Sequence, residues 1–227
     1  MLKMIENKLD DVWVEKYRPE TLDEIVGQDE IVTAISEAIA KGNLSNLIFE
    51  GKAGTGKTTT AKAIANKLDA DFMELNSSEE RGIEIVRGKI TKFVKHLSFN
   101  GKQIKICFLD EADSMTTEAQ MCLRPVMEKY TRNCRFIIGC NYVDKIIAPI
   151  RNSRCKIYRF KPIDKNSVLK RLLHIAEKEN IFISMTEKDR EALAELSERC
   201  RGDMRKAIND LQMGDYDLSE SEQVFTL

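Results

Sequence analysis

The sequence predicts an α/β fold in which a five-stranded parallel β-sheet lies between helices and is followed by a small all-helical domain. Short apolar runs bounded by turn residues alternate with longer helical patterns, and this alternation is typical of a parallel sheet covered by helices. After Pro162 only helical patterns follow. With 227 residues, of which 42% are hydrophobic and 32% charged, the chain is long enough and apolar enough for a buried core.

The apolar runs and helical patterns place each element along the chain. We expect strands at 47–50, 72–76, 104–110, 136–140 and 156–160, with helices near 29–41, 57–68, 83–95 and 117–130 between them. Pro125 falls inside the last of these helices, where it should cause a kink or an early start. Helices near 166–179, 187–200 and 203–213 complete the chain. The predicted domains are therefore a sheet domain at 1–161 and a helical lid at 162–227.

Composition and charge exclude several classes of protein. The net charge of −1 means that any contact with nucleic acid must come from a local basic surface. The stretch from Arg81 to Lys105 is the candidate, because it holds seven basic residues and one acid. No apolar run approaches the roughly 20 residues of a membrane span, so we expect no membrane contact. The six cysteines contain no C-x-x-C pair, which disfavours a zinc site and fits a reducing, cytoplasmic setting.

The segment Gly51-Lys-Ala-Gly-Thr-Gly-Lys57-Thr58 matches the phosphate-binding pattern G-x-x-x-x-G-K-[ST] between a predicted strand and a predicted helix. Its glycines let backbone N–H groups turn toward phosphates, Lys57 reaches the outer phosphates, and Thr58 ligates magnesium. A glycine-rich turn that binds nothing is the alternative, and the intact lysine and threonine argue against it. The candidate contacts of ATP are Gly51, Lys52, Ala53, Gly54, Thr55, Gly56, Lys57, Thr58 and Thr59.

Polar residues follow two further apolar strands. Asp110 and Glu111 end the strand at 104–110, where Asp110 would hold Mg²⁺ and Glu111 would polarise the attacking water. A pair of acids that caps the next helical segment is the alternative. Asn141 ends the strand at 136–140 and could orient the same water, or simply form a turn.

The order of the remaining motifs resembles that of replication-factor-C-type clamp-loader subunits, which are AAA+ proteins. The resemblance covers residues 12 to 212 and rests on Trp13-Val-Glu-Lys-Tyr-Arg-Pro19, Val26-Gly-Gln28, the phosphate loop, Leu109-Asp-Glu-Ala-Asp113, Asn141, Ser153-Arg-Cys155 and Gly202-Asp-Met-Arg205. Residues 68–72 and 98–103 are more similar to clamp loaders of T4-type phages, whereas Trp13 and Arg81-Gly-Ile are more similar to the cellular branch. Both lineages stay open.

The resemblance implies roles for individual residues around ATP. Val14, Arg18 and Val26 would border the adenine, and Asn141 would be the sensor-1 residue. Arg205 would be the sensor-2 arginine that reaches phosphate from the helical lid. Arg154 would act in trans as an arginine finger on the ATP of a neighbouring subunit. Without the resemblance, a surface arginine in a basic stretch would be the simpler interpretation of Arg154.

The resemblance also implies contacts with DNA and with other subunits. Arg81 is similar to a basic residue that restrains the catalytic glutamate until DNA arrives, and Arg87 is similar to a phosphate contact. Gln120 and Arg124 match positions that link the sites of adjacent subunits. The helix around 120–130 would face the sliding clamp. For Lys89, Lys92 and Lys95, a solvated helix face is an equally good interpretation.

These implications predict an ATPase subunit of a sliding-clamp loader, which places a ring clamp on primer–template DNA as part of a hetero-pentamer. Its location would be the cytoplasm and nucleoid, or the nucleus of a eukaryote. Two alternatives remain: a nucleotide-holding docking subunit without turnover, and another AAA+ DNA motor such as a branch-migration helicase. Family members continue into a helical collar that this sequence lacks, so we expect a fragment that is monomeric by itself.

Overall fold

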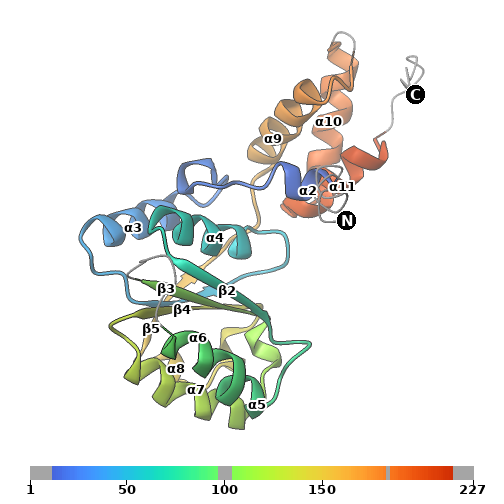
Figure 1. Cartoon of the computed structure of the whole chain (residues 1–227). Helices are drawn as coiled ribbons and strands as arrows, with labels where there is room; N and C mark the ends of the chain where they lie inside the picture. Colours follow the sequence, from blue (N-terminus) through green and yellow to red (C-terminus); the bar gives the residue numbers. More distant parts are fainter. Residues whose placement is uncertain (1–11, 97–103, 183–184, 217–227) are drawn as a thin grey trace, which may run out of the picture. The chain divides into compact units, whose positions relative to one another are not determined.

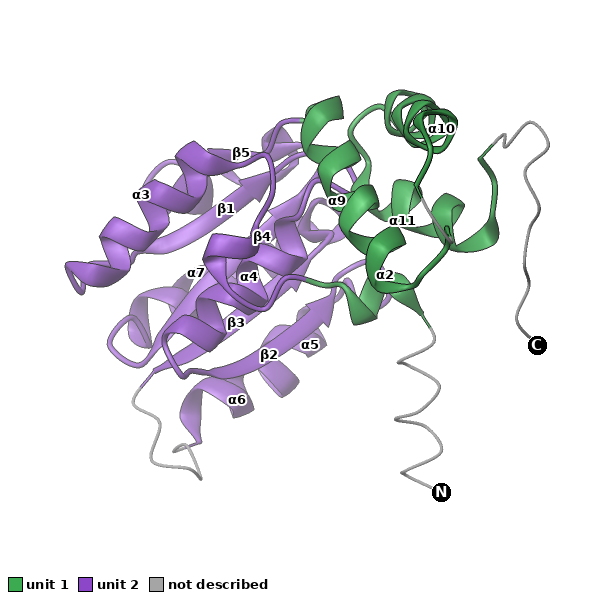
Figure 2. Cartoon of the chain, turned by 90° about the horizontal axis from the view of Figure 1, so that it is seen from above, with its two compact units in different colours: residues 1–18, 162–227 green, residues 19–161 purple. Residues whose placement is uncertain are grey.

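The structure is a computed structural model that describes residues 12–96, 104–182 and 185–216 (Figure 1). The phage-like segment at 98–103 lies outside the described residues. The chain divides into two compact units, one formed by Pro19–Lys161 and the other by Met1–Arg18 together with Pro162–Leu227 (Figure 2). We describe each unit by itself.

The larger unit contains a sheet of five parallel strands, which are β1 (Asn46–Glu50), β2 (Asp71–Asn76), β3 (Lys105–Asp110), β4 (Cys134–Cys140) and β5 (Cys155–Arg159). Their order across the sheet is β2-β3-β4-β1-β5. The predicted five-stranded parallel sheet is confirmed, and the strand starts shift by only a residue or two. In this order, the carboxyl ends of β3, β4 and β1 lie side by side, which is where parallel α/β sheets bind ligands.

Helices cover both faces of this sheet (Figure 1). One face carries α3 (Asp29–Ala40), α4 (Lys57–Lys67) and the short 3₁₀ helix η1 (Leu22–Glu24). The other carries α5 (Ile83–Ile85), η2 (Val86–Ile90), α6 (Thr91–Lys95), α7 (Thr117–Lys129) and α8 (Ala148–Arg151). Two further 3₁₀ turns, η3 (Ala112–Ser114) and η4 (Val143–Lys145), follow β3 and β4.

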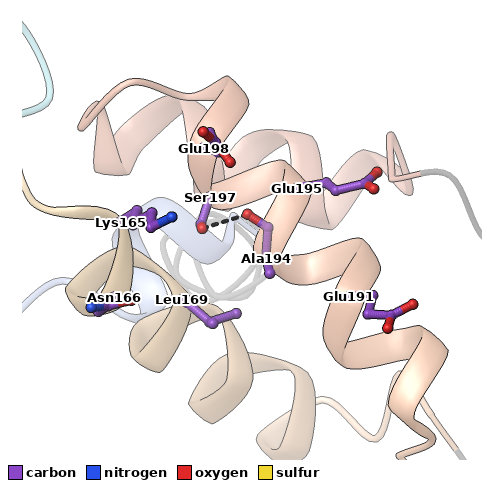
Figure 3. A pocket seen from close by; sticks show the side chains of 8 residues that line it. All are labelled: Lys165, Asn166, Leu169, Glu191, Ala194, Glu195, Ser197 and Glu198. Carbon is purple, nitrogen blue, oxygen red and sulfur yellow. Dashed lines mark hydrogen bonds between the residues drawn. The ribbon is translucent and has the colours of Figure 1, made fainter.

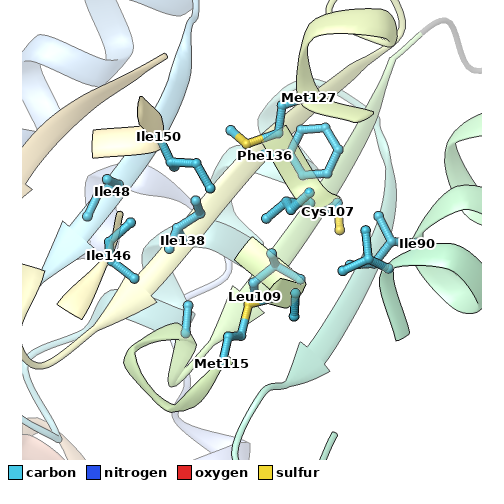
Figure 4. Close-up of a cluster of buried hydrophobic side chains, with 14 of the residues drawn as sticks. Ile48, Ile90, Cys107, Leu109, Met115, Met127, Phe136, Ile138, Ile146 and Ile150 are labelled. Carbon is cyan, nitrogen blue, oxygen red and sulfur yellow. The ribbon is translucent and has the colours of Figure 1, made fainter. Parts of the chain in front are cut away.

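Alternation along the strands gives the sheet a separate apolar core on each face. On β3, Phe108 packs with Ile64 of α4, whereas its neighbour Cys107 packs with the opposite core. On β4, Phe136 belongs to that same opposite core (Figure 4). Successive side chains of a strand point to opposite faces, so apolar residues at every position bury both faces.

One helical prediction differs in detail from the structure, and the bounds of another are confirmed. The helix expected at 83–95 contains a π-helical segment, η2, in which the Thr91 hydroxyl donates to the Val86 carbonyl at 2.6 Å. Helix α7 continues through Pro125 and begins at Thr117, where the side chain of Thr116 accepts a hydrogen bond from the Ala119 amide at 3.2 Å. Thr116 is a favourable N-cap residue and fixes the start of the helix.

Among its described residues, the smaller unit packs four helices: α2 (Trp13–Lys16), α9 (Lys165–Lys178), α10 (Glu187–Arg199) and α11 (Met204–Met213). Its core contains Leu172, Leu193 and Ile208, which are at most 4% exposed. Side chains of Asp164, Thr186 and Asp203 cap the last three helices, which lie close to their expected bounds. Among the described residues, no helix is long and apolar enough to cross a membrane.

The N-terminal segment belongs to this helical unit, although the sequence placed it with the sheet domain. The Lys16 ammonium and the Tyr17 hydroxyl both donate to Glu179 after α9, at 2.6 and 2.7 Å. The Arg171 guanidinium donates to the Tyr17 carbonyl at 2.5 Å. Burial and the bond to Glu179 raise the pKa of Tyr17 to about 12. Such contacts join residues more than 150 positions apart, so local sequence patterns could not reveal them.

A surface pocket of about 350 Å³ lies between α9 and α10 (Figure 3). Glutamates dominate its lining, which consists of Lys165, Asn166, Leu169, Glu191, Ala194, Glu195, Ser197 and Glu198. The Ser197 hydroxyl donates to the Ala194 carbonyl at 2.7 Å within its own helix. Three carboxylates facing one lysine would repel a triphosphate, so this pocket is not the expected nucleotide site.

We predict that Gly202→Ala destabilises the helical unit more than Gly214→Ala does. Both glycines have left-handed backbone angles, with φ of +83° and +73°. A Cβ on Gly202 would lie 2.6 Å from the Ile163 backbone nitrogen, whereas a Cβ on Gly214 would meet nothing within 4 Å. Gly214→Ala should therefore cost about 1 kcal/mol of backbone strain, and Gly202→Ala at least about 2 kcal/mol more. Equal shifts in urea unfolding would contradict the close approach.

Candidate nucleotide site

The phosphate loop joins the end of β1 to the start of α4. The amide of Gly51 donates to the Cys140 carbonyl at 3.1 Å and so extends the pairing of β1 with β4. Gly56, the N-cap of α4, has φ of +99°, a conformation that side chains rarely adopt. The Thr55 hydroxyl donates to the Lys52 carbonyl at 2.8 Å and braces the bend from inside. The loop therefore brings its backbone to the helix N-terminus, where anions bind favourably.

Lys57 is 9% exposed and its ammonium turns back over the loop. It donates to the carbonyls of Gly51 at 2.6 Å and Lys52 at 2.9 Å, and it lies 3.5 Å from the Asn141 side-chain oxygen. The structure therefore brings together Lys57 and Asn141, which are 84 positions apart in the sequence. These carbonyl and amide partners are neutral, and the ammonium can exchange them for charged phosphate oxygens, which bind it more strongly.

Thr58 and Asp110 connect the loop to the end of β3. The Thr58 hydroxyl donates to the Asp110 carboxylate at 2.7 Å, and the other carboxylate oxygen accepts the Glu111 amide at 2.9 Å. A hydroxyl and a carboxylate are hard oxygen ligands of the kind that Mg²⁺ takes when nucleotide phosphates and water supply the others. Among the described residues, no three His, Cys, Asp or Glu side chains cluster as a metal site of their own. The pair therefore fits a nucleotide-bound Mg²⁺.

Glu111 has a backbone conformation that is unusual for glutamate, with φ of 51°. It occupies the N-cap position of η3, yet its side chain makes no capping hydrogen bond. The side chain is exposed. Strained residues of this kind concentrate at functional sites. The geometry therefore favours a chemical role for Glu111 over the capping role that the sequence left open.

Gln28 belongs to the site, although the sequence analysis did not assign it a role. It is 5% exposed, and its side-chain amide donates to the carbonyls of Lys161 at 2.7 Å and Thr55 at 3.3 Å. Its side-chain oxygen accepts the Lys161 amide at 3.4 Å. Gln28 thus connects the phosphate loop to the chain that follows β5. The signal in the sequence was the motif Val26-Gly-Gln28, which carried part of the resemblance without a role for the glutamine.

The other residues predicted around ATP are divided between the two units. Val26 lies in the larger unit, before α3. Val14 lies on α2, Arg18 follows α2, and Arg205 is in the first turn of α11, so these three belong to the helical unit. Arg18 donates to Glu15 at 3.0 Å. Their contacts with ATP stay predictions.

The residues predicted for DNA and coupling lie on α5–α7 and the segment before them. Arg87 lies in η2 and is exposed. The Arg81 carbonyl accepts the Thr116 amide at 3.1 Å, which joins the segment before α5 to the N-cap of α7. The Gln120 side chain is 3% exposed, donates to Met115 and Lys145 carbonyls, and accepts the Ile147 amide at 2.8 Å.

The basic stretch from Arg81 to Lys105 is not a uniform surface. Lys105 is 6% exposed and donates to the carbonyl of Phe93 at 2.8 Å and to that of His96. It therefore satisfies carbonyls at the end of α6 and offers no charge to a ligand. The Lys89 ammonium pairs with Glu80, and Lys102 lies outside the described residues. The sequence analysis overestimated the positive charge of this surface, because Lys105 is the first residue of β3 and is buried.

The predicted finger, Arg154, follows α8 and pairs with Glu128 of α7 in its own chain, with a distance of 2.9 Å from its Nε. Arg124, one turn earlier on α7, lies 3.5 Å from the same Glu128 oxygen. The hydrogen bond from Arg154 lowers the pKa of Glu128 below its ordinary value, so its carboxylate is ionised at neutral pH. The structure thus groups Arg124 and Arg154, which the sequence treated separately.

A comparison with protein families matches residues 47–163 to the ATPase family associated with various cellular activities, AAA. The chain therefore belongs to the AAA family, a family of nucleotide-binding ATPases. Within it, the chain is a homologue of replication factor C small subunits. It is 50% identical over 207 residues to that of Archaeoglobus fulgidus and 48% identical over 206 residues to that of Methanoculleus marisnigri.

These alignments cover 89% and 88% of this chain but only 63% and 62% of the two relatives, so the chain spans less than two thirds of their length. Among solved structures, the Thermotoga maritima RuvB Holliday junction branch migration motor is similar, with a TM-score of 0.70 at 20% identity. That match covers 86% of this chain and 64% of RuvB. At this identity the similarity establishes the fold alone.

We predict that Gln28→Ala weakens ATP binding roughly tenfold, because the loop loses its buried link to the end of the sheet while every phosphate-facing group stays in place. Isothermal titration calorimetry measures the affinity. Asn66→Ala is the control, because Asn66 also donates a side-chain hydrogen bond to a carbonyl, that of Glu20 at 2.9 Å, but on the exposed end of α4. Equal ATP affinities of the two variants would contradict the proposed role of Gln28 in supporting the phosphate loop.

Proposed function

We propose that this chain is the ATPase part of a sliding-clamp-loader subunit, which uses ATP binding and hydrolysis to load a ring clamp onto primer–template DNA. The observation that carries the proposal is the 2.7 Å contact between Thr58 and Asp110, which supports a phosphate and magnesium site at the end of β3. It occurs in a chain 50% identical over 207 residues to a replication factor C small subunit. The proposed partners are other loader subunits in a hetero-pentamer, the clamp and DNA, in the cytoplasm and nucleoid or in a eukaryotic nucleus.

In the proposed reaction, the amides of residues 51–59 and the Lys57 ammonium bind the phosphates of ATP, and Val14, Arg18 and Val26 border the adenine. Lys57 leaves its carbonyl partners for the outer phosphates, and Arg205 adds a second positive charge. Thr58 and Asp110 would hold Mg²⁺, and this ion would supply positive charge that neutralises the phosphates.

Glu111 accepts a proton from the attacking water, and Asn141 orients that water. Asn141 is suited to this because its backbone amide donates to the Asp113 carboxylate at 3.4 Å, which fixes the residue at the strand end. Its side-chain oxygen lies 3.5 Å from the Lys57 ammonium, so the side chain is directed toward the phosphate site. General base catalysis by a positioned carboxylate contributes about 10² to 10⁴ in rate.

Assembly would complete the site. Arg154 would stabilise transition-state charge on the ATP of the next subunit, which contributes about 10³ to 10⁵ in rate. Arg81 and Arg87 would contact DNA phosphates, and Gln120 and Arg124 would couple that contact to the site. The backbone bond between Arg81 and Thr116 supports such coupling, because it joins the start of the basic segment directly to α7.

Two other functions are less well supported. A docking subunit that holds ATP without turnover would not need Glu111 in its strained, uncapped position. A branch-migration motor is suggested by the RuvB-like fold. Fold similarity alone does not carry function. Binding to a sliding clamp in the presence of ATP favours the loader, and translocation along duplex DNA without clamp binding favours the motor.

The first prediction from this proposal separates binding from turnover. Lys57→Ala should abolish measurable ATP binding, because the ammonium is the group that meets the outer phosphates. Glu111→Gln should keep ATP affinity within about twofold and reduce hydrolysis at least about 100-fold, because only the proton acceptor is lost. Calorimetry and a phosphate-release assay measure the two effects. Unchanged turnover of Glu111→Gln would support the docking alternative.

The second prediction concerns Arg154. The chain is expected to be monomeric at low concentration, so contacts in trans form only when a high concentration brings chains together. Turnover per subunit should then rise with protein concentration, and Arg154→Ala should abolish that rise while ATP affinity stays the same. A mixture of Arg154→Ala and Lys57→Ala chains should recover hydrolysis, because the second chain donates an intact arginine to the intact ATP site of the first. Arg151→Ala is the matched control, because Arg151 lies three residues away and pairs with Asp144 at 2.5 Å. Turnover that does not depend on concentration or on Arg154 would overturn the assignment.

A further inference from the structure

The guanidinium of Arg154 is held by three contacts. Its Nε donates to the Glu128 carboxylate at 2.9 Å, its Nη2 donates to the same carboxylate oxygen, and its Nη1 donates to the Pro149 carbonyl. The side chain is 19% exposed, and the Arg154 backbone amide donates to Ile150 at 3.2 Å. Both the side chain and the backbone of this arginine are therefore fixed, which is unusual for a long surface side chain.

A count of donors shows what these contacts leave available. A guanidinium carries five N–H groups, one on Nε and two on each terminal nitrogen. The described residues accept one from each of the three nitrogens, so one N–H remains on Nη1 and one on Nη2. Donors on the two terminal nitrogens of a guanidinium can bind two oxygens of one phosphate. Glu128 therefore holds the guanidinium without using the edge that a phosphate needs.

The charge of the cluster favours an anion. Arg124 and Arg154 share the single carboxylate of Glu128, and together they leave one net positive charge, since two positive charges and one negative charge sum to +1. The pKa of Glu128 lies below its ordinary value because Arg154 donates to it, so the carboxylate stays ionised at neutral pH. Glu128 can therefore keep its ion pair with Arg154 while the cluster still attracts an anionic phosphate.

Magnitudes decide whether Glu128 would obstruct or assist Arg154. An exposed ion pair changes an equilibrium by less than about tenfold, whereas a finger contributes about 10³ to 10⁵ in rate. Competition from Glu128 is thus too weak to withhold Arg154 from a transition state. Ordering a long side chain in advance is worth up to about tenfold, because that entropy is no longer lost when the contact forms.

We propose that Glu128 is a positioning residue: it holds the Arg154 guanidinium with its remaining two donors directed outward, ready for the triphosphate bound by a second subunit. The inference rests on the proposed function, because it requires Arg154 to act in trans.

The test uses the mixed chains, with Glu128→Gln placed on one partner at a time. The donor chain carries Lys57→Ala and supplies Arg154; the acceptor chain carries Arg154→Ala and supplies the ATP site. Glu128→Gln on the donor should reduce the hydrolysis of the mixture about three- to tenfold, because the guanidinium must be ordered during the reaction. On the acceptor it should change nothing, because that chain has no Arg154 to position.

Glu118→Gln on the donor is the matched control, since Glu118 is an exposed glutamate on the same helix, and it should leave hydrolysis unchanged. Equal losses from Glu128→Gln on either partner would show a general structural role and overturn the inference. An unchanged or increased rate of hydrolysis with Glu128→Gln on the donor would overturn the inference as well. If the donor gives no stimulation even with Glu128 intact, the trans role of Arg154 fails first, which distinguishes failure of the proposed function from failure of this inference.

Discussion

The hydrogen bond between the Thr58 hydroxyl and the Asp110 carboxylate, at 2.7 Å, is the contact on which the interpretation of this molecule depends. It joins the first turn of α4 to the end of β3, and it exists because β1 lies two strands away from β3 with β4 between them. The phosphate loop after β1, the acids after β3 and Asn141 after β4 therefore open at the same edge of the sheet. Strand order thus decides which polar residues can share one ligand.

Most of the sheet could be predicted from the sequence because its strands are buried on both faces and appear as uninterrupted apolar runs. The phosphate loop was equally predictable, since its glycines, Lys57 and Thr58 lie in one short segment. Gln28 was part of a motif that carried the resemblance, but its role could not be predicted. Its partners are backbone atoms of Thr55 and Lys161, which are distant in the sequence and leave no trace in residue type. Lys105 was misjudged because a lysine that satisfies helix carbonyls looks the same in sequence as a solvated one.

In the helical unit too, contacts between distant parts of the sequence could not be predicted. Its helices were predicted from their period, but the attachment of residues 12–18 depends on Glu179 and Arg171, more than 150 positions away. The motif Val-Glu-Lys-Tyr-Arg-Pro therefore supplies side chains and a carbonyl for packing against α9, besides the adenine contacts that its resemblance implies. Similarly, a role for Glu128 could be inferred only from the structure, which places Arg154 beside α7.

A crystal structure with a non-hydrolysable ATP analogue and Mg²⁺ tests the central claim most directly. The account predicts density for the triphosphate along the loop amides, with the Lys57 ammonium moved from the Gly51 and Lys52 carbonyls onto phosphate oxygens and Mg²⁺ beside Thr58 and Asp110. An empty loop at saturating analogue, with Lys57 still on those two carbonyls, would contradict it.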